Sequence, residues 1–302
     1  NVTVSSESYG DIDPRSNRVK AVVSAEGIKE LADKTYKAFV EAIKKLIELM
    51  RKGWEHLLDA GMAQEGKIDE LLDRLKNVKS TAVGQEIMIH RPGMLFADGE
   101  EVYPELKPLF GLTHFALVAY PKSMEDYYSK VGTYIKSLND YELSEEEIRE
   151  NLDSVAKPLH DLAKDPSSRA LFNGNYAVDI SENELSFGIK ETDGKEPPSE
   201  FELPVAPPIK LRKLLGEIRQ INTILKDYRP ANERVIKAAE KLVGVSEKLE
   251  NADGIARTIL SVVKDATPRN REIAQYIAKV TKTYLVIIER QIERHEAATN
   301  VK

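Results

Sequence analysis

The sequence predicts a mainly α-helical protein: a long amphipathic helical hairpin, a small α+β middle region and a C-terminal helical bundle. Apolar residues recur at steps of three and four near both ends of the chain, while the middle shows short stretches typical of strands. A proline-rich stretch divides the chain. We expect an extended arm over 1–23, the helical hairpin with the α+β region over 24–191, a linker over 192–207 and a four-helix unit over 208–302.

The longest helical signal near the start runs from Ser24 to Gly61 and contains Trp54, the single tryptophan. Ser24 is a typical N-cap residue and Gly61 a typical residue after a helix end. A second amphipathic segment covers residues 65–78. A short turn at 61–66 would fold it back antiparallel on the first helix. We therefore predict a helical hairpin, in which Trp54 is a packing residue.

The middle region combines strands with helices. Residues 85–90 (QEIMIH) and 113–121 (THFALVAYP) have the length and flanks of strands, and Asp98-Gly99 is a hairpin turn. A helix is expected after Ser123, and another after Ser144 with Glu147 completing a capping box. Residues 176–191 read as two strands around a turn at 181–184.

The last part of the chain is helical. Residues 192–208 hold five prolines and four acidic residues, which disfavours a helix or a central strand. Beyond them four helices are predicted, and they are the segments Ile209–Tyr228, Ala231–Leu249, Gly254–Lys264 and Pro268–Ala297.

Composition excludes several classes of site. The 302 residues contain no cysteine, so disulfides, thiolate metal sites and cysteine nucleophiles are excluded. No apolar run reaches the length of a membrane span, and no membrane partner is expected. Residues 1–207 carry 25 Lys and Arg against 38 Asp and Glu, whereas residues 208–302 carry 19 against 12. This asymmetry fits ordinary variation of helix surfaces, or a C-terminal part that faces DNA or an acidic protein.

No motif of a known catalytic or cofactor site occurs, and no two of the five histidines have the spacing of a helix-borne metal site. The one pattern worth testing is His160-Asp161 with His114, which resembles the arrangement in metal-dependent phosphohydrolases. That fold needs His114 on a helix, whereas the sequence predicts a strand there. We assign no catalytic, cofactor-binding or metal-ligating residue, and no cofactor.

Three other groups have a plain structural interpretation beside a functional one. The carboxylates at 145–147 suit the first turn of a helix better than a catalytic pair. Tyrosines that could stack bases are expected to pack in a core, and they are Tyr120, Tyr127, Tyr128, Tyr134 and Tyr141. Basic residues of the last helix are interleaved with Glu272, Glu289 and Glu293, a mixed cluster, and they are Arg269, Arg271, Lys279, Lys282, Arg290 and Arg294.

The N-terminal quarter carries a family resemblance. Ser6-Glu7-Ser8-Tyr9-Gly10-Asp11, followed after a polar stretch by GIKELADKTYKAFVEAIKKLIELMRKGWEHLL, resembles the internal head proteins of large tailed bacteriophages. The resemblance covers about the first 75 residues and implies a proteolytically matured structural protein of the virion, inside the capsid. Such proteins are trimmed by the prohead maturation protease, commonly after a Glu two residues beyond a small residue. A start at Asn1 without Met is consistent with trimming, and Ser5-Ser6-Glu7 fits the pattern of such a site.

The resemblance leads to one hypothesis and leaves two alternatives. The first is a non-enzymatic virion protein that contacts other phage head proteins and is ejected with DNA; during assembly it would lie in the host cytoplasm. The second is a helical protein that binds a host factor or, weakly through residues 208–302, packaged DNA. The third is a metal-dependent hydrolase that uses region 85–190, with His90, His114 or His160. The oligomeric state is left open by the sequence.

Overall fold

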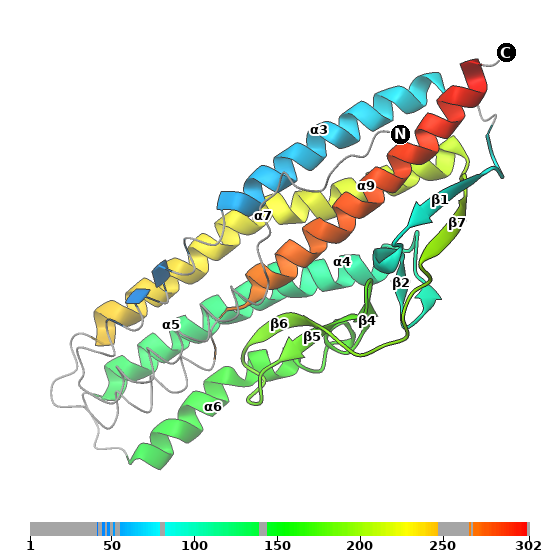
Figure 1. The fold of residues 1–302 in the computed structure, drawn as a ribbon. Helices are drawn as coiled ribbons and strands as arrows, with labels where there is room; N and C mark the ends of the chain where they lie inside the picture. Colours follow the sequence, from blue (N-terminus) through cyan, green and yellow to red (C-terminus); the bar gives the residue numbers. More distant parts are fainter. Residues whose placement is uncertain are drawn as a thin grey trace.

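The computed structural model describes residues 41, 44–45, 47–48, 51, 55–78, 82–138, 144–246, 266 and 268–300. Long helices lie side by side along the molecule, and the short strands lie on one side of them (Figure 1). In chain order the elements are α3 (Glu55–Asn77), β1 (Glu86–His90), η1 (Gly93–Leu95), β2 (Phe96–Ala97), β3 (Glu100–Glu101), α4 (Lys107–His114), η2 (Phe115–Ala119), α5 (Tyr120–Leu138), α6 (Glu145–Leu162), η3 (Pro166–Ser168), β4 (Leu171–Phe172), β5 (Tyr176–Ile180), β6 (Phe187–Glu191), β7 (Glu200–Pro204), α7 (Pro208–Ser246) and α9 (Asn270–Asn300).

Helix α3 is continuous across both glycines at which the sequence predicts a turn. The predicted turn at 61–66, and the antiparallel return of 65–78, are therefore wrong. A glycine inside a helix costs about 1 kcal/mol, and tertiary contacts exceed that cost. Gln64 and Ile68 are buried, and the Gln64 amide donates to the Ala278 carbonyl of α9 at 3.0 Å. Most of the predicted helix before residue 55, including Trp54, lies outside the described residues.

The centre of the molecule is one helix, α4–η2–α5, from 107 to 138. The predicted strand over 113–121 is wrong, and Ser123 lies inside α5 instead of capping it. The apolar run is helical because one side of it, with Phe115, Leu117 and Tyr120, is buried in the core shared with α7, α9 and the sheet, while its other side is exposed at Val118. The turn at 115–119 is a π-helix, in which the Tyr120 N–H bonds to the Phe115 carbonyl. Pro121, just after this π-helical turn, has no N–H to donate to a carbonyl of the preceding turn.

The predicted strands at 85–90 and 176–191 are confirmed, and so is the Asp98-Gly99 hairpin. β2 and β3 pair antiparallel, and the two turn residues have φ of +49° and +77°, as a tight hairpin turn requires. β4, β5 and β6 form an antiparallel three-stranded sheet. β1 pairs antiparallel with β7, so residues 200–204 of the predicted linker form a strand.

Helix α6 begins as predicted. The Glu147 N–H donates to the Ser144 hydroxyl at 3.3 Å, and the Ser144 N–H donates to the Glu147 carboxylate at 2.8 Å, which is a capping box. These bonds hold the pKa of Glu147 below its usual value. Pro158 lies within the helix, which continues to Leu162.

Helices α7 and α9 cover much of the last third. The predicted break near Pro230 is wrong, because α7 is one helix that packs along α3 and α5. Contacts along its length offset the roughly 3 kcal/mol that an internal proline costs. The predicted last helix is confirmed as α9, and the predicted segment Gly254–Lys264 lies outside the described residues.

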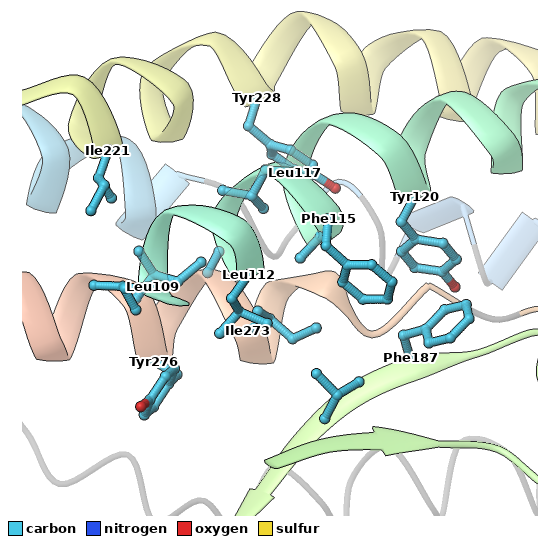
Figure 2. Close-up of a cluster of buried hydrophobic side chains, with 14 of the residues drawn as sticks. Leu109, Leu112, Phe115, Leu117, Tyr120, Phe187, Ile221, Tyr228, Ile273 and Tyr276 are labelled. Atoms are coloured by element: carbon cyan, nitrogen blue, oxygen red, sulfur yellow. The ribbon is translucent and has the colours of Figure 1, made fainter. Parts of the chain in front are cut away.

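One cluster of buried apolar side chains joins residues on both sides of the predicted linker. At its centre Phe115 of η2 and Tyr120 of α5 meet Phe187 of β6 edge to face, with ring centroids 5.2 and 5.0 Å apart (Figure 2). Tyr228 of α7 and Ile273 of α9 complete this part of the core. The proposed division into separate domains stays a prediction, although the helices on its two sides share this core.

Candidate functional site

The histidines of region 85–190 lie on different elements. His90 is exposed on β1, with its Nδ1 3.0 Å from a Glu200 oxygen, and the Nδ1 of His160 lies 3.6 Å from a Glu184 oxygen. His114 is exposed on helix α4, so the expectation that it lies on a strand is wrong. The predicted strand therefore no longer argues against the phosphohydrolase pattern. Among the residues that the structure describes, no three or more His, Asp or Glu are grouped to hold a metal ion.

The tyrosines confirm the packing interpretation where the structure describes them. Tyr120, Tyr127 and Tyr128 are at most 1 % exposed. Tyr134 lies at the surface side of α5 and its hydroxyl accepts from the Asn151 amide at 3.3 Å. Tyr141 lies outside the described residues. Buried phenols of this kind are core groups and offer no stacking platform to a base.

A buried group of polar side chains, here called the polar seam, joins α9 to the strand region; it consists of Tyr103, Asn173, Tyr276, Tyr284, Gln291 and His295. The Asn173 amide donates to the Met94 carbonyl at 2.8 Å and to the Tyr284 hydroxyl at 2.9 Å. The Tyr276 hydroxyl donates to the Asn173 carbonyl at 2.8 Å. Burial raises the pKa of Tyr284 to about 12, so its hydroxyl keeps its proton.

The other half of the polar seam closes the C-terminal end of α9 on the β1–β7 pair. Gln291 donates to the Tyr103 hydroxyl at 2.9 Å and accepts from the Ala206 N–H at 2.8 Å. The fully buried His295 has its Nε2 2.9 Å from the Ala206 carbonyl, and its Nδ1 accepts from the Ala82 N–H at 3.4 Å. These partners assign the neutral imidazole with its proton on Nε2. Every polar atom named here has a structural partner, so the polar seam positions elements.

One side of α9 is tied to α3 by ion pairs. Arg74 binds Glu296 with two hydrogen bonds, at 2.7 and 2.9 Å, and also reaches Glu289 at 3.1 Å. Lys67 binds Glu289 at 2.6 Å. Glu272, near the start of α9, is engaged by Arg269 at 3.1 Å. Two of the three acids that the sequence places among the basic residues of α9 are therefore neutralised within the chain.

The outward side of α9 is consequently basic. Lys279, Lys282, Arg290 and Arg294 are exposed there with Glu293 as the acid among them, whereas Arg269 turns inward to Asp179 at 3.0 Å. We call these four cations the basic stripe. They follow one another at helical spacing over roughly 22 Å. The sequence interpretation, a mixed cluster, misses the stripe because the ion pairs of Glu289 and Glu272 cannot be seen without the fold.

Basic side chains along one helix face are the electrostatic footprint of phosphate contact. Lys279 also lies 5.8 Å above the Tyr176 ring, which holds one end of the stripe over the sheet. Arg271, the remaining basic residue of the predicted set, is partly buried. The described helices include no segment that is both long and apolar enough to span a bilayer.

Comparison with known proteins gives one family. A family model for phiKZ-like phage internal head proteins matches residues 1–296, nearly the whole chain and far beyond the N-terminal quarter that carries the resemblance in the sequence. No curated protein and no solved structure matches the chain. With a match of this extent over a fold whose helices share one core, the protein belongs to the phiKZ-like phage internal head proteins.

Proposed function

We propose that the protein is a non-enzymatic structural component of the phage capsid interior, where it contacts other head proteins. The observation that carries this proposal is the family match over residues 1–296. The fold is consistent with such a role, because its polar seam and ion pairs fasten long helices to one another instead of lining a reaction site.

Mass spectrometry of purified particles tests the location and the copy number. We expect the chain in full particles at a fixed ratio to the major capsid protein, and protected from added protease until the capsid is opened. Loss of the chain during particle purification, or its digestion on intact particles, would contradict a position inside the capsid.

The proposal includes trimming by the prohead maturation protease and ejection with the DNA. Ser5-Ser6-Glu7 has the small–x–Glu pattern of such a site. The N-terminus of the chain from mature particles should differ from that of the newly synthesised chain, and a Glu7→Gln change should leave any cleavage after residue 7 undone. Particles that have released their DNA should hold less of the chain than full particles. Identical N-termini on the new and the mature chain would contradict trimming. Equal amounts of the chain in full particles and in particles without DNA would contradict ejection.

We infer a second role, weak contact with packaged DNA, from the basic stripe on α9. The DNA contact that the sequence analysis assigned to residues 208–302 is thus assigned to one face of α9. Each phosphate contact contributes a slope of about −0.9 to a plot of log affinity against log salt concentration. Changing all four stripe cations to Gln should therefore lower the magnitude of that slope by roughly 3 to 4.

The matched control removes four cations from another exposed surface of the same region, on α7: Lys210, Lys213, Lys237 and Lys241, each changed to Gln. This variant has the same net charge as the stripe variant. We expect it to keep most of the salt dependence. An equal loss of salt dependence in the two variants would mean that net charge alone governs binding. A parent chain that does not bind DNA at low salt would contradict the proposed DNA contact.

A further inference from the structure

The two-stranded sheet of β1 and β7 lies near the C-terminal end of α9 (Figure 1). The Val205 N–H donates to the Gln85 carbonyl at 2.7 Å, and the Arg91 N–H donates to the Ser199 carbonyl at 3.0 Å. In an antiparallel pair such bonds alternate along each strand, so residues 87 and 89, like the Gln85 carbonyl and the Arg91 N–H, direct their backbone groups to β7. Residues 86, 88 and 90 direct theirs to the opposite side.

That opposite side is an open strand edge in the part of the chain that the structure describes. No backbone hydrogen bond joins the outward groups of Glu86, Met88 or His90 to another described residue, and β7 is the one described strand that pairs with β1. The three side chains are exposed, Met88 by 40 %. A strand edge with unpaired N–H and C=O groups is a template for another strand.

The side chains along this edge are complementary to themselves. If a second β1 runs antiparallel with Met88 opposite Met88, then Glu86 lies opposite His90 at both ends of the pairing. All three outward residues then fall in hydrogen-bonded pairs, each of which exchanges two backbone bonds. The exposed apolar side chains meet at the centre, and an acid faces an imidazole on each side, which is the arrangement that a two-fold interface requires.

The other edge of the same sheet has the opposite character. Its outward residues are Glu200, Glu202 and Pro204. Pro204 has no N–H to donate, and pairing two copies about Glu202 would set like charges directly opposite each other. The β7 edge is thus protected against self-pairing, while the β1 edge is not.

We propose that two copies of the chain associate through their β1 edges, antiparallel and centred on Met88. An interface of five residues a side is smaller than that of a standard stable complex, so the association is weak and becomes populated at high protein concentration. The proposal adds an interface between copies to the proposed role in the head, and does not depend on that role.

Cysteine crosslinking of the full chain tests the proposal, since the protein has no cysteine of its own. Opposed residues in a hydrogen-bonded pair have Cα atoms about 5.5 Å apart, within reach of a short bis-maleimide. Met88→Cys should give crosslinked dimer in several-fold higher yield than Glu202→Cys, which places a thiol on the same sheet face but at the other edge. Equal yields from the two variants would overturn the proposal.

The register gives a second, independent test. A mixture of Glu86→Cys and His90→Cys chains should crosslink to each other better than either chain crosslinks to itself, because like positions lie roughly 13 Å apart in this pairing. Preferential self-crosslinking of either variant would overturn the register.

Proline variants remove the backbone bonds without a crosslinker. Met88→Pro deletes an outward N–H at the centre of the β1 edge, and Glu202→Pro deletes one at the β7 edge. By sedimentation equilibrium at high concentration, Met88→Pro should be monomeric while Glu202→Pro associates like the parent chain. Circular dichroism verifies that both variants are folded. A monomeric parent chain at millimolar concentration, or crosslinking of Met88→Cys in particles to a different head protein alone, would contradict a second copy as the occupant.

Discussion

The central aromatic core and the polar seam both bury their side chains but differ in the contacts that these side chains make. In the core, Phe115, Tyr120 and Phe187 meet through ring faces and edges, so the contacts depend on volume and shape. In the polar seam, Gln291 and His295 each satisfy a particular backbone group of the β1–β7 region. A cavity in the core can be partly filled by relaxation, whereas a missing partner in the polar seam leaves a defined N–H or C=O unpaired.

The two kinds of burial serve different parts of the fold. The core holds the long helices together, and the polar seam sets the position of the β1–β7 pair on α9. A hydrogen bond is directional, so a polar contact fixes register more narrowly than an apolar one. Substitutions in the core, in the polar seam and in the surface ion pairs therefore separate the two kinds of contact.

Phe187→Ala should lower the free energy of unfolding by about 3–5 kcal/mol, because a fully buried ring is lost together with two edge-to-face contacts. Urea denaturation followed by circular dichroism measures the change. Phe110→Ala is the matched control: Phe110 is 40 % exposed, and its removal should cost less than about 1 kcal/mol. Similar losses for the two would mean that the core is not centred on Phe187.

His295→Leu should cost about 2–3 kcal/mol, since it keeps the volume approximately but leaves the Ala82 N–H and the Ala206 carbonyl unpaired. Hydrogen exchange distinguishes this mechanism from a packing defect. The Ala82 amide should exchange faster in the variant, while amides of α5 keep their protection. Uniform loss of protection would show that His295 acts as a core residue and not as a hydrogen-bonding one.

Arg74→Met should cost about 1–2 kcal/mol, less than either buried change, because its ion pairs with Glu289 and Glu296 are partly exposed to solvent. Lys76→Met, which removes an ion pair whose two side chains are 72 % and 71 % exposed, should cost nearly nothing. Chemical denaturation of both variants checks the difference. If Lys76→Met lowered the free energy of unfolding as much as Arg74→Met does, a general effect of removing positive charge would explain both losses.

The sequence predicted elements whose signals are local. The Ser144 capping box and the Asp98-Gly99 hairpin depend on residues within a few positions, and both are confirmed. The strands β1, β5 and β6 were found from short apolar or alternating patterns, and the last helix from its apolar period.

The failures have one physical cause, which is that tertiary contacts override local preference. The apolar run at 113–121 looks like a buried strand because periodicity cannot tell it from a buried helix, and its surroundings of α7 and α9 decide the outcome. Gly61, Gly66 and Pro230 look like breaks, yet long-range packing keeps α3 and α7 continuous.

The candidate surfaces were predicted only in part. The basic residues of α9 are visible in the sequence, but the basic stripe emerges only when Arg74 and Lys67 of α3 neutralise Glu289. The polar seam gave no signal, since Asn173 and Gln291 are ordinary polar residues until the fold brings Tyr284 and Tyr103 to them.

The smallest effect we predict is a pH dependence of the α3 ion pairs, which the amide hydrogen bonds of Asn173 and Gln291 in the polar seam do not share. A hydrogen bond from Lys226 lowers the pKa of Glu65 against the opposing effect of burial, and a hydrogen bond from Arg74 does the same for Glu296. Because both pKa values are depressed in the folded state, their stabilisation is present above the ordinary value of 4.5 and is lost as the pH falls below it.

Solvent screening keeps each contribution below about 1 kcal/mol. Unfolding free energies measured between pH 7 and pH 3 should fall less steeply for a Glu65→Gln, Glu296→Gln double variant than for the parent chain. Gln291→Leu, which removes hydrogen bonds of the polar seam but no titratable group, should leave that slope unchanged. A double variant with the slope of the parent would mean that the ion pairs of Glu65 and Glu296 do not contribute to stability.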